Sequence, residues 1–488
     1  MAADIISTPL TYLFNLSLDT GVIPEIWKSA FVIPLLKGGD STILDNYRPI
    51  SKLCVLSKIL ESFISDQVTC YLNVHKVLSS NQSGFRKKHS TTTAVMKVLN
   101  DIIGSVDKGD YCASLFIDLS KAFDTVDHEI LLHRLRSVGL SKHVIFWFKN
   151  YLINRTQCVQ AEGKNSGLLE IVKGVPQGSV LGPLLFTIYI NSIDHGNQDV
   201  NLHFYADDTV MYCGAPSKQQ ALIKLQAAFD VFQSRLHTLK LVLNADKTKI
   251  MLFSSSKKAV DNFIPLQTLQ GNVIELVKEY KYLGITIDDK LSFGSHITNL
   301  TKQLKIKLGF YFRNKFCFSF NVRKRLVSAT FLPVLDYGDV VYQYASSQLL
   351  SSLDAVYHSA LRFISDSKPL THHCILYNRV SWPSLSIRRK IHFYLIIYKT
   401  ILGLLPSYLG CLIQKKSVGK YSLRSDNCFT LSVPFVRTEL GKRAFMYAAP
   451  FEWNSIQTKF KLQTLLPMEH FKSIIGSLEE DSLICNCF

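Results

Sequence analysis

Two adjacent aspartates, Asp207 and Asp208, interrupt a stretch of apolar and aromatic residues that runs from position 202 to position 212. The β-branched and aromatic residues on both sides are typical of two short strands, and the segment 206–208 is typical of the tight turn that joins them. Two carboxylates at the tip of a hairpin repel each other unless a cation neutralises them, and Mg²⁺ prefers carboxylate oxygens. The pair therefore predicts a metal site at a hairpin turn, although aspartate also occurs in turns for purely local reasons.

A third carboxylate, Asp118, follows the mostly apolar run Tyr111–Ile117, which has the pattern of a buried strand. If this strand lies beside the hairpin, Asp118 converges with Asp207 and Asp208 at one edge of a sheet. Three carboxylates can hold two Mg²⁺ ions about 4 Å apart, the arrangement that activates a 3′-hydroxyl and stabilises a leaving pyrophosphate. The alternative is that Asp118 only caps the turn that follows it.

Glycine and proline punctuate a third segment, residues 174–186, which continues as an apolar, helix-like stretch to about position 193. Glycine allows a backbone to approach a ligand closely, and the Gln177 side chain offers both a hydrogen-bond donor and an acceptor. Both properties suit a ligand-binding loop. The alternative is an ordinary loop that leads into a core helix, and this segment taken alone favours that alternative.

Together, the three segments resemble motifs A, B and C of reverse transcriptases, in that family's order. Their details are similar to the polymerase of LINE-type (non-LTR) retrotransposons, in the Jockey-like branch or a relative of it. The resemblance is dense over residues 20–290 and weaker to about residue 460. The other segments that carry it are NYRPIS at 46–51, GFRKKHST at 84–91, AFDTVDH at 122–128, LNADKT at 243–248 (motif D) and YKYLGI at 280–285 (the primer grip, motif E).

This resemblance implies an α+β fold of the right-hand polymerase type, with fingers, a palm that contains an antiparallel sheet, a helical thumb and a mainly helical C-terminal extension. Trp382-Pro383 and Ala449-Pro450 suggest boundaries within the extension. The expected divisions are an N-terminal helical lead-in at 1–30, fingers and palm at 31–290, a thumb-like basic helical region at 291–370, and an extension of unknown role at 371–488.

The spacing of apolar residues predicts individual elements as well. Beyond position 290 the pattern is mainly helical, and the apolar segment 392–413 is broken by Lys399 and Pro406, which favours a core helix over a membrane span. Helices are expected at about 8–18, 55–72 and 222–239, and a short strand is expected at 273–275.

The resemblance also implies a role for each acid. We expect Asp118 and Asp207 to bridge two Mg²⁺ ions, which Mn²⁺ could replace, with Asp208 as the third carboxylate. The backbone carbonyl of Leu119 is an expected further ligand. Because nucleotidyl transfer depends mostly on positioning and charge neutralisation, metals and cations dominate the expected site.

The resemblance assigns the nucleotide and primer contacts to further residues. Lys37 and Arg48 are expected to hold the triphosphate, and the alternative for both is an ordinary surface charge. Phe123 is expected to block a ribose 2′-hydroxyl and so select dNTPs, and the alternative is a core aromatic residue. The remaining expected contacts are Gln177 and Gly178 with the nucleotide and template, Lys247 as a general acid toward pyrophosphate, and Tyr282, Leu283 and Gly284 as the primer grip.

The chain is basic, with a formal charge of +17, and a protein of this kind usually meets a polyanion. The segment 302–325 holds eight Lys and Arg residues without an acid, and aromatic residues lie between them. Such a segment suits a nucleic-acid duplex or stacked bases. The alternative is a helix pair with a buried aromatic face and a solvated basic face, and both can hold together. The expected nucleic-acid contacts are Lys302, Lys305, Arg313, Lys315, Arg323, Lys324 and Arg325.

The 11 cysteines are odd in number and scattered, and no secretory signal opens the chain. We therefore expect reduced thiols in an intracellular protein that acts in the nucleus, the cytoplasm or both. The expected partners are an RNA template, a DNA primer or target DNA, and dNTPs, with no membrane and no obligate protein partner.

Three functions are open at this point. The first, which the intact acids favour, is the RNA-directed DNA polymerase of a non-LTR retrotransposon. The second is a catalytically silent, truncated, nucleic-acid-binding remnant, because elements of this type usually carry an endonuclease ahead of the polymerase and the sequence holds no visible nuclease or RNase H constellation. The third is an RNA-templated RNA polymerase with the same palm, and Phe123 argues against it.

Overall fold

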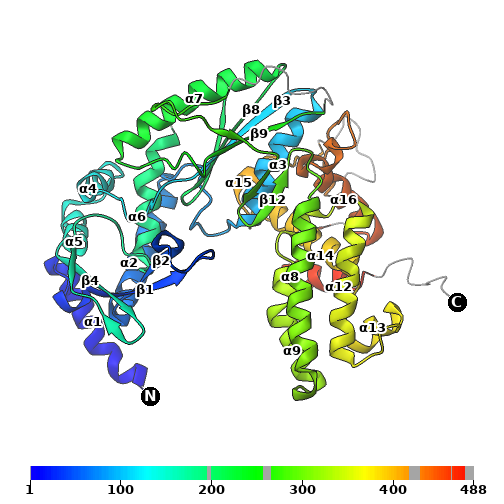
Figure 1. The fold of residues 1–488 in the computed structure, drawn as a ribbon, viewed down its shortest axis with the longest axis horizontal. Helices are drawn as coiled ribbons and strands as arrows, with labels where there is room; N and C mark the ends of the chain where they lie inside the picture. The colour runs from blue at the N-terminus through cyan, green and yellow to red at the C-terminus, as the bar shows by residue number, and fades with distance from the viewer. Residues whose placement is uncertain (1, 195–198, 256–264, 417–428, 463, 479–488) are drawn as a thin grey trace.

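The computed structural model describes residues 2–194, 199–255, 265–416, 429–462 and 464–478. They form an arch, with helix α1 (Ala2–Thr20) at one end, the main sheet at the top and the long helices α8 (Gly294–Arg313) and α12 (Ser347–Ser365) at the other end (Figure 1). Strands and helices mix up to Asp288, and the named elements after it are helices. This arrangement confirms the α+β fold of the right-hand polymerase type that was expected, with fingers, palm and thumb.

The fingers contain a small sheet built from two distant parts of the chain. Strand β1 (Ser29–Leu36) pairs with β2 (Tyr47–Lys52) as an antiparallel hairpin, in which Leu35 lies opposite Arg48. On its other side β1 pairs in parallel with β4 (Arg155–Ala161). Lys37 and Arg48 therefore flank the loop of a hairpin that the rest of the sheet anchors. The smaller strands of this sheet are β5 (Lys164–Asn165) and β6 (Leu169–Ile171).

Helix α1 is longer than the predicted helix at 8–18. The prediction of its start was wrong because Pro9, which disfavours a helix interior, lies inside α1. Phe14 is buried against Trp27 in the first hydrophobic core, and Leu10 and Leu18 pack against that core at helical spacing. Tertiary packing of this face outweighs the hydrogen bond that proline removes.

The palm sheet has the strand order β10-β9-β3-β8-β7. Its central strand β3 (Tyr111–Ile117) was predicted with these bounds, and it pairs antiparallel with β8 and with β9. Ala113 and Leu115 belong to one hydrophobic core, whereas Cys112 and Phe116 belong to a second core on the opposite face. Because both faces are covered, the strand is apolar along most of its length rather than alternating. Its partners are β7 (Asn201–Tyr205), β8 (Asp208–Ala215), β9 (Lys249–Phe253) and β10 (Glu275–Leu276), the last shifted slightly from the strand expected at 273–275.

Helices cover both faces of the palm sheet. Helix α7 (Lys218–Thr238), close to the prediction of 222–239, lies over β3 and β8 (Figure 1). Helix α3 (Thr91–Asp107) contacts β3 and β8 through the second core, and it was not predicted. A signal for it existed, because Ser90 and Thr93 form a capping box at its start. The 55–72 prediction is confirmed as α2 (Val55–Val74).

The C-terminal extension packs against helix α3 of the palm. Helix α14 (Leu385–Ile401) packs with α16 (Phe445–Lys459), and both contribute to a third core that also contains Met96 of α3. The helix expected over 392–413 thus ends at Ile401, before Pro406. The boundary expected at Ala449-Pro450 is wrong, because Pro450 lies inside α16, whose buried face holds this interior proline in the third core.

The remaining helices and strands complete the arch. Among the described residues, no helix combines the length and the apolar character that crossing a membrane requires. The divisions at positions 290 and 370 stay predictions. The remaining elements are α4 (His128–Ser137), α5 (Lys142–Leu152), α6 (Leu181–Ile190), β11 (Glu279–Tyr282), β12 (Ile285–Asp288), α9 (Phe320–Thr330), α10 (Leu332–Leu335), α11 (Asp339–Tyr342), α13 (His373–Val380), α15 (Ser407–Gly410) and α17 (Met468–Gly476).

Candidate active site

Asp207 lies in the turn between β7 and β8, as the hairpin prediction required. Tyr205 pairs with Asp208, so Ala206 and Asp207 are the two residues of the turn. Ala206 has a φ of +60°, a left-handed conformation that costs a non-glycine residue roughly 1–2 kcal/mol. The turn therefore needs support from neighbouring residues to keep Asp207 in place.

The segment 81–84 provides this support, and sequence reasoning missed it. The amide of Ser83 donates to the Phe204 carbonyl at 2.8 Å, and the amide of Phe204 donates to the Asn81 carbonyl at 2.9 Å. The Gln82 side-chain oxygen accepts from the Ala206 amide at 3.4 Å and from the Gly84 amide at 2.8 Å. A Cβ at Gly84 would lie 2.2 Å from the Ala206 nitrogen, so only glycine allows this close approach.

Asp118 lies next to the other two acids because of the strand register. Ile117 pairs with Thr209, which places Asp118 opposite Asp208 where the two strands end. The Asp118 amide donates to the fully buried Thr248 hydroxyl at 3.3 Å. The Asp118 carbonyl accepts from the Asn244 amide at 2.9 Å. Residues 243–248, expected as motif D, thus hold the backbone of Asp118, a role that the sequence did not reveal.

The electrostatics of the three acids point to a cation site. Burial, together with the charges of Asp207 and Asp118, raises the pKa of Asp208 to about 7. Burial also raises the pKa of Asp207, with a contribution from Asp118. Asp118 and Asp207 are partly buried and Asp208 is exposed. Carboxylates that repel one another are a donor set of hard oxygens, which fits a divalent ion such as Mg²⁺. Not all of their oxygens lie within 4.8 Å of one another, so the site is broader than a single tight chelate.

Leu119 forms an isolated antiparallel bridge with Leu243. The two hydrogen bonds of this bridge use the Asp118 carbonyl and the amide of Ser120, and neither uses the Leu119 carbonyl. The predicted metal ligand is therefore compatible with the local pairing.

The fingers bring positive charge to the acids. Arg48 and Lys37 both lower the pKa of Asp207, although burial and Asp118 raise it overall. Both cations are exposed at the loop end of the β1–β2 hairpin, where the Lys37 amide donates to the Asn46 carbonyl at 2.8 Å. An exposed guanidinium and ammonium above three carboxylates suit the phosphates of a nucleotide. Lys247 is exposed and is not among the charges that act on Asp207 or Asp208.

Phe123 lies on the loop after Asp118 and is half-buried. Its ring stacks on Phe186 of α6 at 4.5 Å and meets the edge of Phe85 at 6.3 Å. Two aromatic neighbours therefore fix the ring direction, while part of the ring remains accessible. The packing fits the alternative of a core aromatic residue, and the selection of dNTPs by this ring stays a prediction.

The loop that contains Gln177 and Gly178 is held from both sides. The Gln177 side-chain amide donates to the Asp124 carboxylate at 2.9 Å, and its backbone carbonyl accepts from the Ser51 amide at 2.6 Å. Gly178 has a φ of +116°, and a Cβ there would lie 2.7 Å from the Ser51 carbonyl oxygen. The loop therefore joins the fingers hairpin to the segment after Asp118.

The predicted primer grip is the turn of the β11–β12 hairpin. Leu283 and Gly284 both have positive φ, as a two-residue type I′ turn requires. Tyr280 of this hairpin stacks on Phe116 at 4.4 Å. Burial raises the pKa of Tyr280 to about 12, with contributions from Asp208 and Asp118, so the hairpin lies against the acids. The Tyr337 hydroxyl donates a hydrogen bond to the Leu283 carbonyl at 2.7 Å and so stabilises the turn.

The basic segment of the thumb divides into two groups. Lys315 and Arg323 form ion pairs with Asp366, and Lys324 donates to the Val380 carbonyl at 2.7 Å, so these cations have protein partners. Tyr311 is buried whereas Phe316 is 96% exposed, so the aromatic residues are only partly core. The exposed members of the predicted nucleic-acid contacts are Lys302, Lys305, Arg313 and Arg325.

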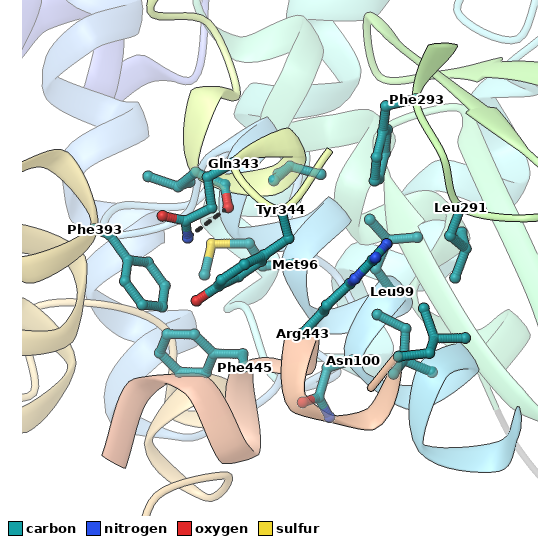
Figure 2. Close-up of a pocket in the computed structure, with 14 residues that line it drawn as sticks. Met96, Leu99, Asn100, Leu291, Phe293, Gln343, Tyr344, Phe393, Arg443 and Phe445 are labelled. Carbon is teal, nitrogen blue, oxygen red and sulfur yellow. Dashed lines mark hydrogen bonds between the residues drawn. The ribbon is translucent and has the colours of Figure 1, made fainter. Parts of the chain in front are cut away.

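A cavity of about 40 Å³ lies away from the acids, between α3 and the extension (Figure 2). Tyr344 and Arg443 enter it from opposite sides, and Met96 and Phe445 form part of its apolar wall. The volume suits a few water molecules and is too small for a nucleotide. The cavity lies where palm, thumb and extension meet, and it is not part of the candidate active site at Asp118, Asp207 and Asp208.

Comparisons with known proteins agree with this geometry. The family described as reverse transcriptase (RNA-dependent DNA polymerase) matches residues 35–287. The RNA-directed DNA polymerase from mobile element jockey of Drosophila melanogaster is 32% identical over 369 residues, which are 73% of this chain and 40% of that protein. The probable RNA-directed DNA polymerase from transposon BS of the same species is 27% identical over the same shares. The chain thus spans about 40% of the length of these relatives.

A solved structure, apo telomerase from Candida tropicalis, is 13% identical, with a TM-score of 0.41 over 83% of this chain and 70% of the other.

Proposed function

The chain belongs to the reverse transcriptase family, and we propose that it is the RNA-directed DNA polymerase of a non-LTR retrotransposon. The observation that carries this proposal is the convergence of Asp118, Asp207 and Asp208 at one end of the palm sheet, with Arg48 and Lys37 acting on them from the fingers. The similarity to the jockey and BS polymerases supports the same element class.

The proposed reaction is in-line attack of a primer 3′-oxygen on the α-phosphate of a dNTP, with loss of pyrophosphate. Two Mg²⁺ ions, or Mn²⁺, would supply Lewis-acid activation and charge neutralisation when bound between the carboxylates. Asp118 and Asp207 would hold the ions, Asp208 would add the third carboxylate, and the Leu119 carbonyl would be available as a further oxygen. Arg48 and Lys37 neutralise the triphosphate, which steers it toward the acids.

The surrounding residues select and align the substrates. In this proposal Phe123, whose ring direction is set by Phe186 and Phe85, blocks the ribose 2′-hydroxyl and so selects dNTPs. The Leu283-Gly284 turn lies against the acids and holds the primer end. The remaining proposed contacts are Gln177 and Gly178 with the nucleotide and template, and Lys247 as an acid toward pyrophosphate.

The proposed partners are an RNA template, a DNA primer or target DNA, and dNTPs, in the nucleus or the cytoplasm. Lys302, Lys305, Arg313 and Arg325 offer an exposed basic surface for the duplex. Lys315, Arg323 and Lys324 orient thumb helices through their internal partners and contribute less to that surface.

The experiment is Mg²⁺-dependent dNTP incorporation on a poly(rA)/oligo(dT) primer-template, beside the double variant Asp207→Asn/Asp208→Asn. We expect incorporation by the native chain and none by the variant, with equal binding of the primer-template. A folded chain that binds RNA but incorporates no dNTP in Mg²⁺ or Mn²⁺ would support the silent remnant instead. Equal use of rNTPs would support an RNA polymerase.

A further inference from the structure

A second group of metal-ligand side chains lies at the start of helix α13, on the thumb side of the arch and away from β3 and β8 (Figure 1). It consists of His372, His373 and Cys374, and their ligand atoms all lie within 4.8 Å of one another. All three residues are partly buried rather than exposed. The group belongs to neither the candidate active site nor the cavity of Figure 2.

The local backbone explains how three consecutive side chains converge. His372 is the N-cap of α13 and has extended dihedral angles, with φ −63° and ψ 145°, whereas His373 is the first helical residue. The change of direction at the cap brings the two imidazole rings to 4.0 Å, and the following residue, Cys374, completes the group. In a continuous helix consecutive side chains point about 100° apart and do not share a site.

Another histidine, His358, lies beside the group on a different helix. The ring of His358, from α12, stacks on that of His373 at 5.4 Å and with an interplanar angle of 13°. A 2.6 Å hydrogen bond joins its Nε2 to the Tyr377 hydroxyl. In metal sites a histidine typically uses one ring nitrogen for the ion and the other for such a bond, which fixes the ring orientation. This bond leaves Nδ1 of His358 as its possible ligand atom, outside the group of three whose ligand atoms lie within 4.8 Å of one another.

The chemistry of the donors selects the ion. Imidazole nitrogens with a thiolate sulfur are the ligand set of Zn²⁺, which they bind tetrahedrally, whereas Mg²⁺ requires oxygen ligands. We propose that His372, His373 and Cys374 bind one Zn²⁺ ion, with water or the neighbouring His358 in the fourth position. This site is separate from the Mg²⁺ site of the palm and holds no catalytic group.

The ion would stabilise the connection between α12 and the start of α13. The C-terminal end of α13 receives Lys324 of α9, through the Val380 carbonyl, and the ring of the following Trp382 lies 5.8 Å from the same ammonium. Metal binding at the other end of α13 would therefore rigidify the support of the basic helix α9. Because an ion that binds only the folded chain stabilises it, Zn²⁺ is expected to raise the melting temperature.

The test is titration of the reduced, metal-free full chain with Co²⁺, a spectroscopic substitute for Zn²⁺. We expect one equivalent to produce the visible bands of a tetrahedral site and a near-ultraviolet sulfur-to-cobalt band, both removed by Zn²⁺ and neither by Mg²⁺. Cys374→Ser should abolish the sulfur band and weaken Co²⁺ binding by about 100-fold or more, the scale on which metal sites respond to lost ligand interactions. Cys411→Ser and Cys317→Ser, at exposed cysteines, are the matched controls and should leave the spectrum unchanged.

Cys374→His separates ligand loss from misfolding, because it keeps a metal-binding group. It should retain Co²⁺ and the Zn²⁺-dependent rise in melting temperature while it loses the sulfur band. No saturable spectrum with the native chain, or a sulfur band that persists in Cys374→Ser, would overturn the proposal. Since Mg²⁺-dependent dNTP incorporation is not read out, failure of this test leaves the proposed polymerase function standing.

Discussion

The hydroxyl of Tyr408, in the C-terminal extension, lies 3.0 Å from the hydroxyl of Ser83, beside the β7–β8 hairpin whose turn contains Asp207. Ser83 also contacts His203 of strand β7 at 3.1 Å, and its amide bonds to Phe204. Tyr408 donates to Thr93 of α3 at 3.2 Å as well. The extension thus reaches the segment that supports the turn of Asp207, and we expect Tyr408 to act as a positioning residue.

Replacement of Tyr408 by Phe removes this connection and keeps the ring. We expect kcat for dNTP incorporation to fall about 10-fold while the KM for dNTP changes little, because an unsupported turn loosens Asp207 without touching the nucleotide contacts. A lost buried hydrogen bond costs about 1 kcal/mol, which corresponds to a factor of 5 to 10. Steady-state kinetics and urea unfolding measure the two effects.

The matched control is Tyr398→Phe, because the Tyr398 hydroxyl bonds to the Leu466 carbonyl entirely within the extension. Both variants should lose similar stability, and only Tyr408→Phe should lose kcat. Equal kinetics in the two variants would assign Tyr408 a purely structural role.

Asp118→Asn should lower kcat/KM by 10³-fold or more, on the order of several kcal/mol of transition-state stabilisation, because it weakens a bridging metal ligand. Asp110 precedes the other end of the same strand, so Asp110→Asn is the control. Its kcat/KM is expected to stay within a factor of about two of the native value. Mg²⁺-dependent incorporation measures both. Activity retained in Asp118→Asn would remove this residue from the catalytic group.

Stability of the metal-free chain should depend on Asp208. Its pKa is about 7 in the folded chain against an ordinary value of 3.8, so the folded state binds this proton more tightly than the unfolded state. The associated stability is present below about pH 4 and is lost as the pH rises through 7. In EDTA, the stability of Asp208→Asn relative to the native chain should therefore be higher at pH 8 than at pH 5. Because Asp208 is exposed, solvent screening limits this gain to about 1 kcal/mol.

Urea unfolding at the two pH values measures this difference, and added Mg²⁺ should reduce it by stabilising the native chain. A difference of the same size at pH 5 would show that packing, rather than titration of Asp208, is responsible.

Phe123→Val should relax discrimination against rNTPs by about 10-fold or more, because a smaller side chain leaves room for the 2′-hydroxyl. The ratio of kcat/KM for dTTP and UTP on a poly(rA) template measures it. A loss of stability with unchanged discrimination would mean that the stacking on Phe186 is the whole role of the ring.

The exposed thumb cations should contribute to duplex affinity in a salt-dependent way. Lys302→Ala/Lys305→Ala should reduce the slope of log affinity against log salt by about 2, since each phosphate contact contributes about 1. Lys315→Ala is the control, because Lys315 is paired with Asp366. A fluorescence-anisotropy titration at several salt concentrations distinguishes them, and an equal slope change in the control would contradict the division into two groups.

Much of the palm was predictable because its signals are local. The apolar run Tyr111–Ile117 and the turn at Asp207 carry their structure in their own residues, through burial on both faces and turn chemistry. Helix α3 was not predicted, although Ser90 and Thr93 form a capping box at its start. Helix α1 is longer than predicted, because it begins at Ala2 and continues through Pro9. The boundary predicted at Pro450 was wrong as well, because Pro450 lies inside α16 and this helix packs into the third core.

By itself, the sequence determined the strands, the turn and the identity of the acids, because neighbouring residues decide those features through periodicity and backbone preference. Only the tertiary structure decided that Asp118 faces Asp208, that Thr248 holds its backbone, and that Tyr408 reaches Ser83 across 325 positions of the chain. Such contacts depend on how distant elements pack, and no local pattern encodes the partner of a buried hydroxyl.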